Sequence, residues 1–211
     1  MKKPDLRKWR PDDPRRLRMA EKRLEILRAA RPILLRDGLG GTTLDRVVSE
    51  GRISKMTLYR HFPSKEALFE GLVIHMCDSM REHLENALSA DIRKPGRVRL
   101  ADELRAFTSA LIEPDWLAFY RLIVADGWRF PNLSATFDQS GMRVIRQRIA
   151  ELLESGGVAA TKSMQVASEV VALALGDGYQ RAVLGIGTSK ENEVFTQQIE
   201  AAVAHGFRSL A

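Results

Sequence analysis

The chain has 211 residues, of which 45% are apolar and 28% charged, so it is long enough to bury a core and has the charge content of a globular protein. Its single cysteine, Cys77, excludes an internal disulfide and a metal site built from several cysteines. Charged side chains interrupt every stretch of ten residues, which excludes a membrane span of about 20 apolar residues, and the N-terminus lacks the apolar stretch of a secretory signal. These features are typical of a cytoplasmic protein.

Positive charge is concentrated near the N-terminus. The net charge is +6, but residues 1–62 contain 17 Lys or Arg and 8 Asp or Glu, whereas the remainder contains 16 and 19. A basic N-terminal third on a mildly acidic body indicates a protein that binds nucleic acid. A solvated basic tail is the alternative interpretation of the same charge.

Residues 1–19 are predicted to form a basic arm, because the segment is polar and contains several prolines. Either this arm is a solvated tail or it contacts the minor groove or phosphates of a duplex. Its basic residues are Lys2, Lys3, Arg7, Lys8, Arg10, Arg15, Arg16 and Arg18.

A first helix is expected from about residue 20 to Gly38, where apolar residues recur at helical spacing. Pro32 lies inside this pattern and should kink or loosen the last turns. The series Thr42-Thr43-Leu44-Asp45 fits a capping pattern of Ser or Thr followed three residues later by Asp or Glu. It predicts a second short helix, which ends at Gly51-Arg52.

Residues 43–62 are a candidate helix-turn-helix. Ser54 can cap a short helix from Lys55 to about Arg60, and Ser64 can cap a long helix to about residue 88. A major groove admits one α-helix, and a first helix must brace the second. The bracing side has apolar Val47, Val48, Ile53 and Leu58, and the outer side has Lys55, Met56, Thr57 and Arg60.

The rest of the chain is also helical in pattern, with helices expected at about 98–112, 114–128, 132–155, 162–186 and 190–209. No alternating apolar run bounded by turn residues occurs, so no sheet is expected. The predicted fold is all-α with about nine helices.

Residues 20–75 resemble the DNA-binding domain of the tetracycline-repressor (TetR) family. The most specific part is the run from Thr57 to Phe69, TLYRHFPSKEALF, and Gly38 and Thr42-Thr43 fall at the family's offsets. A weaker similarity to effector domains covers residues 119–125 and 129–133. The resemblance implies a helix-turn-helix domain at 20–80 and an effector-binding and dimerisation domain at 81–211. It also implies a sequence-specific transcriptional regulator, usually a repressor that a small-molecule effector releases from double-stranded DNA.

The resemblance places Lys55, Met56 and Thr57 at base edges and Thr43, Tyr59, His61 and Lys65 at phosphates. The full predicted DNA-binding set is Thr43, Arg52, Ser54, Lys55, Met56, Thr57, Tyr59, Arg60, His61 and Lys65. Met56 stands where the family commonly has glycine, and we expect its side chain to contact a thymine methyl group.

The turn at Gly51-Arg52 departs from the Ala-Gly that is usual in the family. Either Arg52 adopts a positive φ, at a cost of about 1–2 kcal/mol, or the turn shifts and Gly51 adopts it.

Two later regions each allow two interpretations. Small and apolar residues on the last two long helices form either an ordinary intramolecular core or, as the resemblance implies, the interface of a homodimer. The interface set is Val170, Ala174, Gly178, Arg181, Ala182, Phe195, Ile199, Ala202 and Val203. Aromatic residues of the middle helices either pack a core or line an apolar effector pocket. The pocket set is His75, Met76, Trp116, Phe119, Tyr120, Asp177 and Tyr179.

Other function classes find little support in the sequence. His75 and Cys77 lie two residues apart on a helix and point to different sides, so neither a metal site nor a cofactor is expected. A helical enzyme would need a catalytic motif, and none of the common ones occurs. A helical adaptor that binds only protein is disfavoured by the basic outer side of the second short helix.

Overall fold

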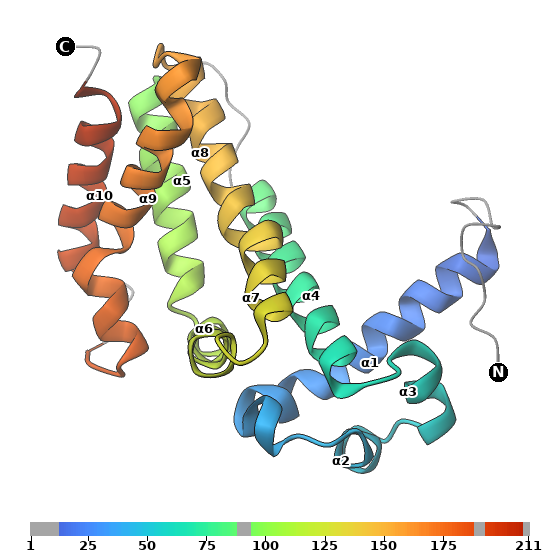
Figure 1. Ribbon diagram of the computed structural model, residues 1–211. Coiled ribbons are helices and arrows are strands. Elements are labelled where there is room, and N and C mark those ends of the chain that lie inside the picture. The colour runs from blue at the N-terminus through green and yellow to red at the C-terminus, as the bar shows by residue number, and fades with distance from the viewer. Residues whose placement is uncertain (1–12, 88–93, 188–192, 209–211) are drawn as a thin grey trace. The chain divides into compact units, whose positions relative to one another are not determined.

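The computed structural model describes residues 13–87, 94–187 and 193–208. Over these residues the chain forms helices and no strand (Figure 1), which confirms the all-α prediction. The chain divides into two compact units, Met1–Met76 with Leu122–Ser134 and Cys77–Arg121 with Ala135–Ala211. None of the described helices combines the length and the hydropathy needed to cross a bilayer.

The first unit is built on α1 (Pro14–Gly41), α2 (Leu44–Glu50), α3 (Lys55–His61) and the first half of α4 (Lys65–Ala87). Each helix buries an apolar side chain at its centre. Ile26 of α1, Val47 of α2 and Leu58 of α3 are fully buried, as is Phe62 in the loop before α4. This shared apolar core holds α1, α2 and α3 together as one unit, because the burial of apolar side chains is the main source of folding stability.

Helix α1 begins earlier than the sequence predicts, and its helical backbone is interrupted at Gly38, where the sequence predicts its end. Asp13 accepts a hydrogen bond from the Arg15 N–H, and Pro14 occupies the first turn, so residues 14–19 of the predicted arm are helical. Residues 1–12 lie outside the described residues. The expected kink at Pro32 does not occur, since the non-helical dihedrals inside α1 are confined to Gly38.

The second unit contains α5 (Gly96–Leu111), most of α6 (Pro114–Asp126) and the second half of α4. Helix α7 (Pro131–Phe137), the π-helical turn η2 (Asp138–Met142) and α8 (Arg143–Ser155) follow one another without a gap, which matches the single helix predicted at 132–155. The π-helical turn itself was not predicted. Helices α9 (Ala160–Val183) and α10 (Glu193–Gly206) complete the unit and lie side by side (Figure 1).

Helix α9 is interrupted at Gly176, whose φ of 34° and ψ of −143° are not helical. Gln198 of α10 lies against this break. Its amide is positioned to accept hydrogen bonds from the backbone N–H groups of Asp177 and Gly178 and to donate one to the Leu175 carbonyl. Nearby, the Nε2 atom of His205 lies 2.6 Å from the Oε2 atom of Glu169. Polar contacts of Gln198 and His205 therefore join α10 to α9.

Candidate DNA interface and ligand hollow

Helices α2 and α3 begin at side-chain caps. The Thr43 hydroxyl accepts a hydrogen bond from the Arg46 N–H, and the Ser54 hydroxyl accepts one from the Thr57 N–H. The predicted capping series Thr42-Thr43-Leu44-Asp45 therefore contains the cap of α2, but the cap is its second residue. Thr42 is fully buried, and its hydroxyl donates instead to the Gly38 carbonyl at 2.7 Å.

The turn between α2 and α3 uses the first of the two predicted conformations. Arg52 has a φ of 52°, whereas Gly51 stays in the right-handed region with a φ of −77°. A Cβ atom at Gly51 would lie only 3.3 Å from the Ile53 side chain and 3.4 Å from that of Ala29. Gly51 therefore allows close packing of the turn onto α1, and Arg52 carries the dihedral strain.

The outer face of α3 is exposed, as the sequence predicted for a helix that reads DNA. Met56 is 68% exposed and Tyr59 41% exposed, and Arg60 and Ser54 are also at the surface. Thr57 is half-buried, and its hydroxyl lies 2.7 Å from that of Ser54. On the opposite face, Leu58 anchors the helix in the core.

Lys55 is exposed but paired within the chain. Its Nζ atom lies 2.7 Å from the Asp45 Oδ1 atom of α2 and 5.8 Å from the centre of the Tyr59 ring. The hydrogen bond to Asp45 raises the pKa of the lysine. The first turn of α3 thus presents an ammonium group whose charge is partly offset by a neighbouring carboxylate.

Two of the predicted contact residues, His61 and Lys65, make internal contacts that the sequence did not reveal. His61 is half-buried, and its enclosed Nε2 atom has no hydrogen-bond partner among the residues that the structure describes. Burial, more than the neighbouring cations, lowers the pKa of its imidazole. Its carbonyl accepts a hydrogen bond from Arg23, whose guanidinium lies 4.1 Å from the centre of the Phe62 ring. Lys65 donates to the Leu39 carbonyl at 3.1 Å.

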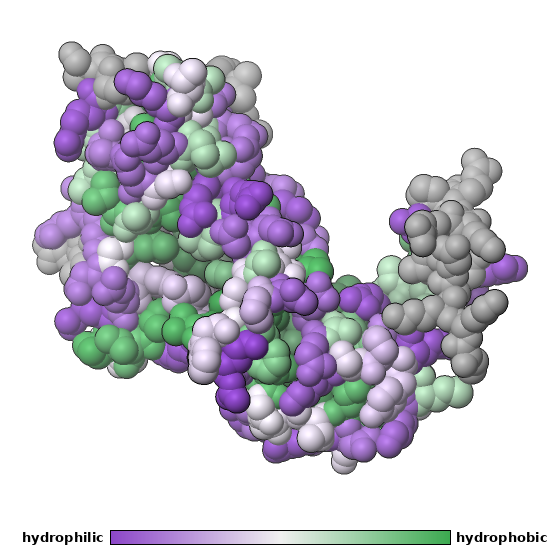
Figure 2. Space-filling model, viewed as in Figure 1, coloured by the Kyte–Doolittle hydropathy of each residue, from purple (hydrophilic) through white to green (hydrophobic). Residues whose placement is uncertain are grey.

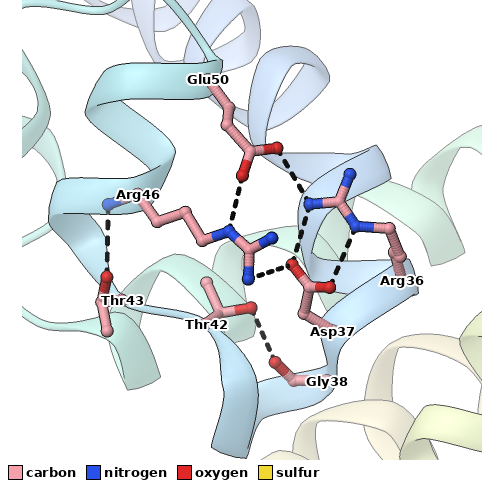
Figure 3. Close-up of polar contacts among 7 residues, drawn as sticks. All are labelled: Arg36, Asp37, Gly38, Thr42, Thr43, Arg46 and Glu50. Carbon is pink, nitrogen blue, oxygen red and sulfur yellow. Dashed lines mark hydrogen bonds and ion pairs between the residues drawn. The ribbon is translucent and has the colours of Figure 1, made fainter.

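A network of four charged side chains ties α1 to α2 (Figure 3). Arg36 bonds both Asp37 and Glu50 at 2.9 Å, and Arg46 lies 3.0 Å from Asp37 and 2.5 Å from Glu50. Hydrogen bonds from Arg36 are the main cause that lowers the pKa of both carboxylates. Only the spacing of Arg46 and Glu50, four apart on a helix, could have indicated this contact from the sequence.

The break in α1 at Gly38 leaves backbone groups that side chains satisfy. Gly38 has a φ of 69° and a ψ of −179°, which interrupts the helical hydrogen bonds. The Leu39 N–H donates to the Asp126 carboxylate of α6 at 2.9 Å, and the Leu39 carbonyl accepts from Lys65. The Gly38 carbonyl accepts a hydrogen bond from the Thr42 hydroxyl, so side chains satisfy these backbone groups at the break.

The second unit contains a hollow with a cavity volume of about 50 Å³, which lies within about 590 Å³ of protein-free space that includes open solvent at its mouth. Four predicted pocket residues line it, namely Trp116, Phe119, Tyr120 and Tyr179. The other three do not: Asp177 is exposed and faces Arg181 at 4.0 Å, and His75 and Met76 are absent from the lining. Helix α4 contributes Cys77, Met80 and Leu84 instead, at the i, i+3, i+7 spacing that the sequence analysis overlooked.

The predicted dimer-interface residues lie mostly inside the single chain. Seven of them are buried within the second unit, namely Val170, Ala174, Gly178, Ala182, Phe195, Ile199 and Ala202. Arg181 is exposed and Val203 half-buried. This burial favours the alternative interpretation, an intramolecular core, for those seven side chains.

Family models match both parts of the chain. Residues 26–72 match the model described as bacterial regulatory proteins, tetR family, and residues 98–208 match the model described as AefR-like transcriptional repressor, C-terminal domain. The chain belongs to the TetR family. It is a DNA-binding transcriptional regulator, as the sequence predicted.

Individual members of the TetR family agree with this assignment. The chain is 27% identical over 143 residues to the HTH-type transcriptional regulator UidR of Escherichia coli K12, covering 64% of this chain and 68% of that protein. The structure of the flavonoid-responsive regulator FrrA is 30% identical, with a TM-score of 0.69 over 90% of this chain and 97% of that one. A TetR-family regulator from Mesorhizobium loti shares the fold, with 22% identity, a TM-score of 0.76 and coverage of 91% and 98%.

Proposed function

We propose that this TetR-family regulator is a homodimeric repressor in which α3 of each copy enters the major groove of an operator, and that a small molecule bound in the hollow releases the DNA. The observation that carries the proposal is the exposed face of α3, where Lys55, Met56 and Arg60 stand out from a helix anchored by buried Leu58. A short helix with one fixed apolar side and one free polar side has the form that groove readers require.

The individual side chains suit distinct contacts. Lys55 and Thr57 can bond base edges, and Met56 can meet a thymine methyl group. Thr43 can bond a phosphate while it caps α2, because its oxygen accepts the Arg46 N–H and its own O–H stays available as a donor. The phosphate-contacting set is proposed to be Thr43, Arg52, Tyr59, His61 and Lys65, with Ser54 and Arg60 beside the bases.

A homodimer is proposed to use the exposed sides of α9 and α10, since most of the small residues first considered are buried. Met164 and Leu173 are 41% and 42% exposed on α9. Hydrophobic surface also gathers over the C-terminal end of α9 (Figure 2), where Leu184 is 73% exposed. Two-fold symmetry would place two recognition helices about 34 Å apart, the spacing of successive major grooves.

Release by a small molecule is supported by the hollow and by a relative whose printed name describes a response to flavonoids. To release DNA, the effector must bind the non-binding conformation of the regulator more tightly than the DNA-binding one. The regulator is proposed to act in the cytoplasm, where it can reach the chromosome, and to catalyse no reaction.

A titration of purified protein against DNA from upstream of its own gene, at two salt concentrations, tests the DNA-reading part of this proposal. Lys55→Ala and Arg60→Ala should weaken binding about tenfold each, at the scale of one charge-assisted contact. Arg105→Ala, which removes an exposed cation from α5, is the matched control and should bind like the wild type. Equal binding of the specific fragment and random DNA would refute the proposal.

A further inference from the structure

The walls of the hollow are aromatic and continuous. Five rings contact one another in series, from Trp116 through Phe119, Phe137 and Tyr120 to Tyr179, with centroid separations of 5.3, 5.8, 6.2 and 5.2 Å. The first two contacts are edge-to-face and the last two are tilted. Because aromatic faces are negative and their edges positive, such a wall offers complementary contacts to another aromatic ring.

The charged side chains at the hollow are already paired. Arg148 donates to Glu103, a buried carboxylate on α5, and Arg81 bonds Asp78 at 3.0 Å and lies 4.0 Å from Glu85. Each guanidinium therefore has a carboxylate partner from the same chain. An anionic guest would have to compete with these carboxylates for the guanidinium charge, and a cationic guest would find no carboxylate among the lining residues. These pairings favour a neutral guest.

One polar group in the wall has no partner. Tyr179 is only 6% exposed, and its hydroxyl oxygen is buried without a hydrogen bond among the described residues. Burial is the main cause that raises the pKa of this phenol, so it stays protonated and keeps a proton to donate. Burial likewise raises the pKa of the Cys77 thiol to about 12, so this lining group is neutral and a poor nucleophile.

We propose that the hollow binds a neutral aromatic molecule that carries an acceptor oxygen, and that this oxygen takes the hydrogen bond offered by Tyr179. The inference rests on the proposed function only for its biological role, since binding itself depends on the second unit alone. The rings supply contact area, and the single unpartnered hydroxyl supplies orientation, as in other apolar sites with few polar groups. A buried donor left unpaired is unfavourable, so the matching acceptor increases affinity and its absence lowers it.

Matched pairs of probes test the acceptor directly. 9-Fluorenone and fluorene share a three-ring skeleton and differ in one carbonyl oxygen, and 1-indanone and indane form the same pair with a two-ring skeleton. Equilibrium dialysis of each probe against the full-length protein measures its affinity. We expect at least one ketone to bind roughly tenfold more tightly than its hydrocarbon, the effect of one satisfied buried donor.

Two variants assign that preference to one residue. Tyr179→Phe should abolish the difference between ketone and hydrocarbon, while Tyr120→Phe, which removes a hydroxyl from the neighbouring ring, should retain it. Circular dichroism and thermal unfolding show that each variant is folded, and Tyr179→Phe should unfold no earlier than the wild type because it removes an unsatisfied buried group. 9-Fluorenone-2-carboxylate should bind more weakly than 9-fluorenone.

The remaining outcomes would overturn the inference. The first is that neither ring system binds, and the second is that ketone and hydrocarbon bind with equal affinity. The third is that Tyr179→Phe keeps the preference for the ketone, and the fourth is that 9-fluorenone-2-carboxylate binds more tightly than 9-fluorenone. A separate mobility-shift assay of the protein on its DNA, with and without the ketone, tests whether the ketone releases the DNA. DNA that stays bound would then refute the effector role of this compound class and leave the ligand assignment of the hollow intact.

Discussion

The Nζ atom of Lys55, at the start of the recognition helix, lies 2.7 Å from the Oδ1 atom of Asp45 in the bracing helix. Both side chains are well exposed, so this ion pair contributes little to stability. Its proposed importance lies in DNA binding, because a lysine that meets a base edge must leave or share its carboxylate. Asp45 also places a negative charge beside the surface proposed to meet the phosphates.

Asp45→Asn should therefore raise DNA affinity. Removal of the carboxylate frees Lys55 and lowers repulsion of the duplex, and we expect a gain of about three- to tenfold at low salt, shrinking as salt rises. Fluorescence anisotropy of a labelled operator at two salt concentrations measures it. Asp102→Asn makes the same change in net charge on α5 and should leave affinity unchanged. An unaltered or lower affinity of Asp45→Asn would show that the pair does not restrain Lys55.

The positive φ of Arg52 predicts a difference between two small substitutions. Arg52→Ala retains the strained dihedral, whereas Arg52→Gly relieves it, so the glycine variant should be more stable by about 1 kcal/mol. Urea unfolding of both variants at one pH measures the difference. Comparing them with each other cancels the loss of the arginine side chain. Equal stability would mean that the turn relaxes to another conformation in the variants.

The lowered pKa of His61 predicts loss of stability in acid. The folded unit favours the neutral imidazole, while the unfolded chain protonates near its ordinary pKa of about 6.5. The folded-state pKa is depressed, so this contribution is fully present above that value and is lost as the pH falls below it. Thermal unfolding at pH 7.5 and 5.0 should show a larger acid loss for the wild type than for His61→Gln, and an identical loss would contradict the assignment.

The contact between Asp126 and the Leu39 N–H predicts a graded pair of variants. Asp126→Ala removes the acceptor and leaves a part-buried amide unpaired, which should cost about 1–3 kcal/mol of unfolding free energy. Asp126→Asn keeps an acceptor oxygen and should cost less. Amide hydrogen exchange at Leu39 provides a local readout, since protection there depends on this bond. If both variants unfold like the wild type, the carboxylate does not stabilise the break at Gly38.

Local signals predicted much of this fold. The periodicity and the serine at residue 54 predicted α3, and the run beginning at Thr57 gave the family, because both depend on residues close in sequence. The sequence did not predict which face of α4 lines the hollow. Met76 and Cys77 are adjacent, but only Cys77 lines it. Successive residues on a helix point about 100° apart, and packing against other helices selects the phase.

Contacts between distant segments were beyond the sequence pattern. The pairing of Arg36 with Glu50 joins residues of different helices, and the ammonium of Lys65 reaches a carbonyl of α1. Likewise, the small residues around Ala174 and Gly178 could suit either a partner copy or α10 of the same chain, and only coordinates show that α10 covers them. Small side chains indicate a close approach without saying which helix approaches.

The π-helical turn at Asp138–Met142 makes the second unit tolerant of a change in chain length in one narrow place. A π-turn of this kind accommodates one more residue than the regular helix around it. Deleting a single residue there would restore an ordinary helix and leave the side chains of α8 on their present faces. The same deletion at the start of α8 would rotate the residues beyond it by about 100°, which would turn Ile145 away from the hollow and Arg148 away from Glu103. We therefore expect one-residue deletions to be tolerated far better in this turn, which contains no fully buried side chain, than at the start of α8.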